Sequence, residues 1–146
     1  MDKSKFMIIS RRRDANCAFS LKIEDDDIGR CSTYKYLGLI IDDKLNWKPH
    51  IDYTCKKVSK ACGILSKLRH CINPDTLRTV YYALAYSYLR YGNIVWGNCS
   101  KLTIQPLQVI QNRIIKIMTF APFGRIDVDP VYLHLKILDL TKIHYL

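Results

Sequence analysis

The sequence predicts an α+β fold that is mainly α, with a short N-terminal β-hairpin and strands followed by a bundle of three main helices and a short helical tail. Residues 1–45 contain short apolar runs between charged clusters, whereas apolar residues recur at helical spacing from residue 46 onward. The charge changes at the same point, from net +1 in residues 1–45 to net +9 in residues 46–146. We therefore expect two domains that meet between residues 45 and 46.

The chain of 146 residues is long enough for one ordinary domain, and its 49% hydrophobic and 25% charged residues are typical of a globular protein. No apolar run in the sequence approaches the roughly twenty residues that cross a membrane. Met1 is followed directly by charged residues, so we expect no signal peptide and an intracellular location, in the nucleus or the cytoplasm.

Two short apolar runs open the chain. Residues 5–10 and 17–23 are predicted to pair as a β-hairpin around a loop at 11–16, and the acidic residues 24–27 to form a solvated linker. Residues 34–41 are predicted to form the main strand, since most of them are β-favouring or apolar.

Gly38 interrupts that strand and indicates a bulge or the close approach of another backbone. Asp42 and Asp43 then indicate a turn that leads into the first long helix. This helix is predicted to have Asn46 as its N-cap and Pro49 in its first turn.

The first helix is predicted to be amphipathic with one strongly cationic side. Its apolar stripe consists of Ile51, Cys55, Val58, Cys62, Leu65 and Ile72. Off that stripe lie Lys48, Lys56, Lys57, Lys60, Lys67 and Arg69, against the single acid Asp52. A solvated face usually mixes both signs of charge, so this side of a rod of roughly 30 Å indicates a polyanionic partner.

A second helix is predicted from its N-cap Asn73 to Gly92, which follows its last turn. Tyr81, Tyr88 and Tyr91 fall on its apolar face and are expected in the core. The residues expected on a wet surface are Tyr82, Tyr86, Arg78 and Arg90.

Residues 93–100 are predicted to form a loop pinned by Trp96, and a third helix is predicted over residues 101–120, ended by residues 121–124. Its expected inward residues are Leu107, Ile110, Ile114, Ile117 and Met118, and its outward ones are Lys101, Arg113 and Lys116. In the tail, Pro130 opens a short helix and Asp139 caps another.

Neither the cysteines nor the acidic clusters are arranged for metal chemistry. The six cysteines include no Cys-x-x-Cys pair and do not combine with the four histidines at zinc-finger spacing, so we interpret them as structural thiols. Metal-dependent nucleotidyl transfer needs carboxylates that converge from separate strands. Residues 25–27 and 42–43 lack a third carboxylate strand, and neither cluster is expected to be a catalytic centre.

An ordered series of motifs along nearly the whole chain resembles one protein family. The series is Tyr36-Leu37-Gly38, Asp42 to Leu45 with Trp47, His50-Ile51, Leu89-Arg90-Tyr91-Gly92, Val95-Trp96-Gly97, Leu107-Gln108, Gln111-Asn112-Arg113 and Ala121-Pro122. It resembles the segment that closes the polymerase core, and the helical thumb that follows it, in reverse transcriptases of non-LTR retrotransposons, especially the jockey-like elements of arthropods.

The resemblance implies that residues 1–45 are a remnant of the polymerase palm and residues 46–146 a thumb-like domain. The run Lys3-Ser4-Lys5-Phe6-Met7 is similar to an element of these enzymes, a Lys-Thr or Lys-Ser pair followed by an apolar strand, that comes shortly after the catalytic aspartate pair. The chain would therefore begin just downstream of that pair. The chain would then be a truncated RNA-directed DNA polymerase that synthesises nothing alone. It would need no cofactor, since Mg²⁺ is expected only in the full-length polymerase.

By the same resemblance, Tyr36, Leu37 and Gly38 belong to the hairpin called the primer grip and lie near the end of the primer. The expected partner is an RNA or DNA primer–template duplex, bound without sequence preference. Association with a full-length reverse transcriptase is a further partner that the resemblance implies.

Three lysines are expected to contact the phosphate backbone because they lie on the cationic side of the first helix: Lys56, Lys60 and Lys67. The resemblance itself does not imply these contacts. Two other functions stay open: a stand-alone nucleic-acid-binding module, and a protein-interaction or inert relic domain whose charge only keeps it soluble. Sequence-specific binding would favour the first of these, and an affinity that is insensitive to salt would favour the second.

Overall fold

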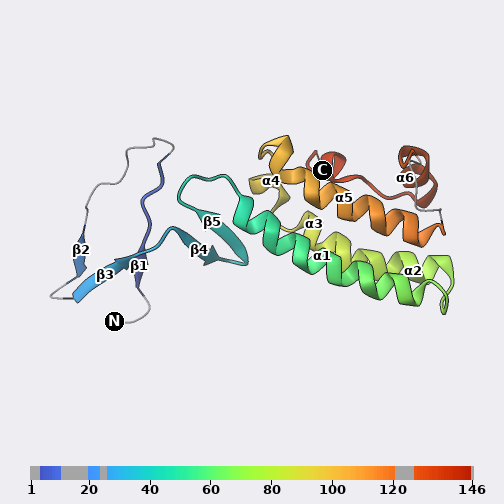
Figure 1. Ribbon diagram of the computed structural model, residues 1–146, viewed down its shortest axis with the longest axis horizontal. Helices are drawn as coiled ribbons and strands as arrows, with labels where there is room; N and C mark the ends of the chain where they lie inside the picture. The colour runs from blue at the N-terminus through green and yellow to red at the C-terminus, as the bar shows by residue number, and fades with distance from the viewer. Residues whose placement is uncertain (1–3, 11–19, 24–25, 121–126, 146) are drawn as a thin grey trace. The chain divides into compact units, whose positions relative to one another are not determined.

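The computed structural model describes residues 4–10, 20–23, 26–120 and 127–145 (Figure 1). Short strands precede a series of helices, which confirms the predicted α+β fold that is mainly α. The chain divides into two compact units, Met1–His50 and Ile51–Leu146, and each is described by itself.

Three short strands of the first unit form a sheet in the order β1-β3-β2. β1 (Lys5–Phe6) pairs in parallel with β3 (Asp26–Arg30), and β2 (Leu21–Ile23) pairs with β3 in the antiparallel direction. The predicted hairpin between the first two runs is therefore wrong, because β3 lies between them. Asp26 and Asp27 are exposed residues of this central strand rather than part of a linker, and an exposed acidic strand gives no apolar alternation to read.

Residues 34–41 form parts of two strands instead of one. β4 (Thr33–Tyr36) and β5 (Leu39–Asp42) pair as an antiparallel hairpin, with Leu37 and Gly38 as its two-residue turn. Both turn residues have positive φ, 45° and 83°, as a type I′ turn requires. Gly38 is therefore a turn residue, and the predicted bulge within one strand is wrong.

The turn after β5 is organised by the buried carboxylate of Asp42. Its two oxygens accept hydrogen bonds from the backbone N–H groups of Asn46 (3.1 Å) and Trp47 (2.9 Å). The predicted turn at residues 42–43 is thus confirmed. Helix α1 (Lys48–Leu68) begins two residues after Asn46, the predicted N-cap, and it carries Pro49 in its first turn as predicted.

Helix α1 buries one stripe of side chains. Its buried residues from Ile51 onward are Ile51, Thr54, Val58, Ala61, Cys62 and Leu65. Cys55 and Ile72, which were predicted for this stripe, are only half-buried, and Ile72 lies beyond the last residue of the helix. The five cysteines that the structure describes are free thiols.

The second helical region contains α2 (Pro74–Tyr81), a π-helical segment η1 (Tyr82–Tyr86) and α3 (Ser87–Arg90). Asn73 caps α2 as predicted, since its side-chain oxygen accepts the N–H of Thr76 at 2.8 Å.

The π-helical segment changes which side chains face the core. The buried residues lie four apart: Leu77, Tyr81, Ala85 and Leu89. This spacing exceeds the 3.6 residues of an α-helical turn. The core position predicted for Tyr81 is confirmed, whereas Tyr88 and Tyr91 are 38% and 54% exposed and the prediction is wrong for both.

Residues 93–100 contain one helical turn, α4 (Asn93–Trp96), where a loop was predicted. Trp96 is fully buried and its Nε1 donates a hydrogen bond to the carbonyl of Tyr91 at 2.9 Å, so the predicted pinning by Trp96 is confirmed. Helix α5 (Lys101–Met118) follows, capped by the Ser100 side chain. The residues predicted to end this helix, 121–124, lie outside the described part of the chain.

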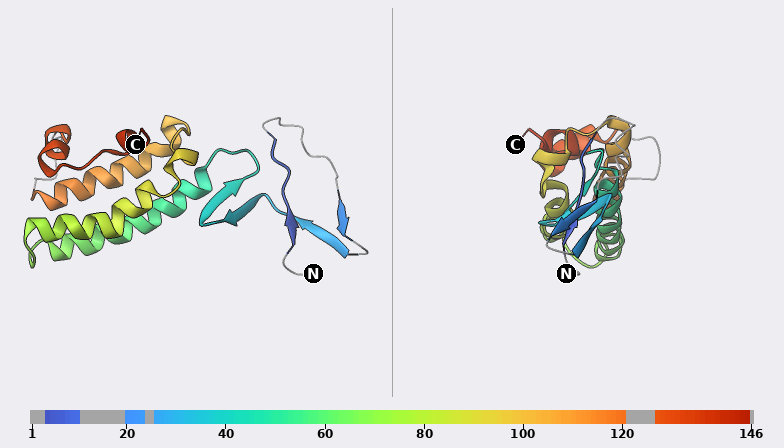
Figure 2. Two further views of the ribbon diagram at one scale, coloured as in Figure 1. Left: turned by 180° about the vertical axis from the view of Figure 1, so that it is seen from behind. Right: turned by 90° about the vertical axis from the view of Figure 1, so that its left-hand side faces the viewer.

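The tail forms α6 (Asp129–Leu135) and α7 (Leu140–Ile143), with Pro130 at the start of the first and Asp139 capping the second, as predicted. Figure 2 shows α1, α2 and α5 extending lengthwise beside one another. Among the described helices, none combines the length and the hydropathy that a membrane span needs.

Candidate nucleic-acid interface

The three nominated lysines of α1 lie together on its exposed side. At about 100° of rotation per residue, Lys56, Lys60 and Lys67 fall within about 40° of one another. Their mean direction is about 180° from that of the buried residues Val58 and Leu65. All three lysines are exposed and both of these core residues are fully buried, as this rotation requires.

These lysines form a row of charges along the helix. With a rise of 1.5 Å per residue, Lys60 lies about 6 Å from Lys56 along the axis, and Lys67 about 10.5 Å further. None of the three ammonium groups forms an ion pair with another described residue. Positive charges without carboxylate partners are available to an external anion.

Two other cations have contacts within the chain: Lys57 in α1, and Arg69, which directly follows that helix. Lys57 is half-buried, and its Nζ lies 5.5 Å from the centre of the Tyr53 ring. Arg69 donates a hydrogen bond to the carbonyl of Ile117 at 3.4 Å and lies over the Phe120 ring at 4.7 Å. Arg69 therefore joins the ends of α1 and α5, and its assignment to the cationic side is wrong.

Tyr36, Leu37 and Gly38 lie together at the tip of the β4–β5 hairpin in the first unit. The side chains of Tyr36 and Leu37 are 58% and 72% exposed, so neither contributes to a core. Leu37 has a left-handed backbone conformation, with φ of 45°, which costs a residue with a Cβ roughly 1–2 kcal/mol. Such strain is typical of residues retained for contact with a ligand.

Strand β5 of the hairpin is tied to the first turn of α1. The N–H of Ile40 donates to Nδ1 of His50 at 3.3 Å, and the His50 side chain is buried. Burial lowers the pKa of His50 below its ordinary value of 6.5, which favours the neutral imidazole that can accept this bond.

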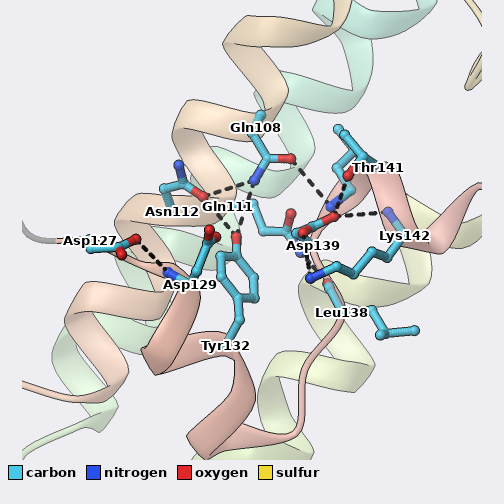
Figure 3. Close-up of polar contacts among 11 residues, drawn as sticks. Gln108, Gln111, Asn112, Asp127, Asp129, Tyr132, Leu138, Asp139, Thr141 and Lys142 are labelled. Atoms are coloured by element: carbon cyan, nitrogen blue, oxygen red, sulfur yellow. Dashed lines mark hydrogen bonds and ion pairs between the residues drawn. The ribbon is translucent and has the colours of Figure 1, made fainter.

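Several motif residues further along the chain hold the tail against α5 (Figure 3). Gln108 donates to the Asn112 side chain at 2.8 Å and accepts the N–H of Leu140 at 3.2 Å. The Tyr132 hydroxyl also donates to Asn112, at 2.8 Å. Gln111 is fully buried and donates to the carbonyl of Leu138 at 2.9 Å.

Sequence reasoning did not find these roles, because they depend on residues up to 32 positions away in the chain. Among the residues that the structure describes, no three His, Cys, Asp or Glu side chains are grouped to hold a metal ion. The Asp42 carboxylate, one half of an acidic cluster, is already used by the turn before α1.

Two curated proteins of Drosophila melanogaster are similar to the chain. It is 28% identical over 106 residues to a probable RNA-directed DNA polymerase from transposon BS, and 27% identical over 123 residues to a probable RNA-directed DNA polymerase from transposon X-element. The matches cover 70% and 76% of this chain but only 12% and 13% of the two relatives. No protein-family model matches the chain, and no solved structure matches it significantly.

Proposed function

Because the chain is related to the RNA-directed DNA polymerases of non-LTR retrotransposons, we propose that it binds a primer–template duplex without sequence preference. In this proposal residues 1–45 are a remnant of the palm and residues 46–146 a thumb-like domain. The observation that carries it is the row of exposed lysines Lys56, Lys60 and Lys67, which lies opposite the core of α1 and has no carboxylate partner among the described residues.

The hairpin tip supplies the second contact of the proposal. Tyr36, Leu37 and Gly38 would lie near the end of the primer, where an exposed ring and an exposed aliphatic side chain can pack on a sugar or a base. The residues that hold Mg²⁺ and carry out synthesis would belong to the full-length polymerase, with which this chain would associate inside the cell.

The salt dependence of duplex binding tests the proposal. We expect the logarithm of the binding constant to fall linearly with the logarithm of salt concentration, with about 0.9 in slope for each phosphate neutralised on B-DNA. Replacing Lys56, Lys60 and Lys67 together by Ala should reduce the slope by up to about 2.7. Fluorescence anisotropy of a labelled duplex at several salt concentrations gives both values.

A matched control removes three positive charges from other helices: Arg78→Ala, Arg90→Ala and Lys101→Ala together. This variant has the same net charge as the lysine variant and should keep most of the wild-type slope. Equal losses in the two variants would mean that only net charge matters, which contradicts a lysine contact surface. An affinity that scarcely changes with salt would instead support the relic or protein-interaction alternative.

Primer extension tests the truncated status of the chain. We expect the purified chain to incorporate no nucleotide on a primed template with Mg²⁺, because the catalytic aspartates would belong to the full-length enzyme. Incorporation that survives repurification would contradict this part of the proposal.

A further inference from the structure

Of three consecutive side chains in α5, the first two form hydrogen bonds with other described residues and the third does not. Gln111 and Asn112 have internal partners: Gln111 donates to the Tyr81 hydroxyl at 3.0 Å, and Asn112 accepts from Gln108 and Tyr132. The next residue, Arg113, is exposed and its guanidinium has no hydrogen-bond or ion-pair partner among the described residues. The guanidinium of Arg113 is therefore available to an external anion.

Arg113 lies next to α1. The two helices run in the same direction, because Arg69, just after α1, donates to Ile117 near the end of α5. Cys62 lies seven residues before Arg69, and burial raises the pKa of its thiol, while the positive charge of Arg113 offsets part of that rise. Arg113 also lies one helical turn before Ile117, so both observations place it near the edge of α1 that faces α5.

The surface of α1 between the lysine row and this edge carries small residues. Ser59, Gly63 and Ser66 are exposed, and by helical rotation they fall between the lysine direction and the Cys62 direction. A Cβ built on Gly63 would meet no atom within 4 Å, so the space above it is open. A shallow depression on α1 is lined by Lys56 and Lys60 from the row and by Ser59 from these small residues.

We propose that one phosphate backbone of the bound duplex lies along this strip, with the α1 lysines on one side and Arg113 of α5 on the other. The inference rests on the proposed duplex binding and adds a contact from a second helix. A guanidinium can donate two parallel hydrogen bonds to one phosphate, so Arg113 would fix the position of the strand as well as add charge. The lysines of the row act instead as point charges.

The test compares Arg113→Ala with Arg90→Ala, a single charge removed from an exposed position on α3. For a phosphate contact, Arg113→Ala should reduce the salt slope by about 0.9, and Arg90→Ala should change it by less than half of that. Arg113→Lys should keep the slope but bind more weakly than the wild type, because the ammonium cannot make the paired hydrogen bonds.

A second pair of variants tests the strip without removing a cation. Gly63→Glu places a carboxylate between the lysines and Arg113, and we expect it to weaken duplex binding at least about tenfold, since like charges repel. The control Thr76→Glu makes the same charge change in the first turn of α2, where a carboxylate is favourable for the helix. It should weaken binding much less.

These results separate the inference from the function on which it rests. If the wild type shows no salt-sensitive duplex binding, the proposed function is wrong. If the lysine variant loses binding but Arg113→Ala matches Arg90→Ala, or Gly63→Glu matches Thr76→Glu, duplex binding stands and the strip is wrong. Circular dichroism of each variant shows whether it is folded, and Arg113→Lys supplies the comparison should the Ala variant unfold.

Discussion

The backbone of Gly97 lies close against Nδ1 of His144. A Cβ at residue 97 would stand 2.5 Å from Nδ1 of His144 and 2.5 Å from the carbonyl oxygen of Asn93. His144 also lies 3.1 Å from the Asn93 side-chain oxygen. The absence of a side chain at residue 97 therefore allows α4 and the end of the tail to approach each other.

The first prediction is that Gly97→Ala destabilises the chain. Overpacking of this kind typically costs about 1–3 kcal/mol, because backbone and ring must both move. The midpoint of urea unfolding, followed by circular dichroism, measures the change. The new methyl group would meet the backbone carbonyl of Asn93 as well as the His144 ring, so a side-chain rotation alone cannot relieve the overlap.

The same substitution at Gly63 should increase the free energy of unfolding instead of lowering it. Gly63 lies within α1 with open space above it, and Ala is favoured over Gly inside a helix by about 1 kcal/mol. Gly63→Ala should therefore raise the urea midpoint. Two Ala variants that shift the midpoint in the same direction would contradict the steric account of Gly97.

The second prediction concerns the turn of the β4–β5 hairpin. Leu37→Asn should stabilise the hairpin by about 1 kcal/mol, because Asn-Gly is the preferred pair for a type I′ turn and Asn tolerates positive φ. Slower amide hydrogen exchange of residues in β4 and β5 is the measurement. If Leu37 contacts the primer, the same variant should bind duplex more weakly although its hairpin is more stable. A variant with both a more stable hairpin and a higher duplex affinity would exclude that contact.

The third prediction is a loss of stability at acid pH through His50. Its pKa is lowered by burial in the folded chain, so the unfolded chain binds the proton first as pH falls below about 6.5. The contribution of the neutral ring is complete above that pH and is lost as pH falls through the lower pKa of the folded state. Protonation at Nδ1 would also remove the bond from Ile40.

Urea unfolding at pH 8 and pH 5 measures this effect against His50→Asn, a variant that cannot titrate at this position. The other three histidines are common to both proteins, so their contribution cancels in the comparison. The wild type should lose more stability than the variant between the two pH values. Equal losses of stability in the two proteins would mean that protonation of His50 does not cause the destabilisation at acid pH.

The fourth prediction concerns the buried pair Gln111 and Tyr81. Gln111→Met should cost about 1–3 kcal/mol, because it leaves the Leu138 carbonyl and the Tyr81 hydroxyl without their donor. Tyr81→Phe removes only the hydroxyl and should cost less. A double-mutant cycle should give a coupling of at least about 0.5 kcal/mol, and strict additivity would contradict the hydrogen bond between them.

The helices could be predicted from sequence where the signal is local. Asn73 followed by Pro74 marks the start of α2, and Asp139 marks the start of α7, because each cap satisfies backbone N–H groups within the next three residues. The exposed position of Lys56, Lys60 and Lys67 was also predictable, since α1 has regular geometry throughout and its faces follow from residue spacing.

The errors arose where distant residues decide the structure. β3 is exposed and acidic at Asp26 and Asp27, and only its pairing with two other strands makes it a strand. Arg69 was assigned to the cationic side because it is charged, although it stands seven residues after Cys62 on the buried side of the helical pattern. Its contact with Ile117, 48 residues away, explains why a cation occupies that side. The contribution proposed for Arg113 likewise depends on α1 and α5 lying together.

The π-helical segment η1 has a consequence for any comparison of this chain with its relatives. One extra residue per turn is geometrically equivalent to a single-residue insertion in an α-helix, and it rotates everything that follows by about 100°. A relative whose helix is α-helical throughout would therefore align with this chain only if a gap of one position is opened between Tyr82 and Tyr86. Without that gap, every later position would be shifted by one, and the relative's equivalent of the buried Leu89 would be matched with the exposed Tyr88.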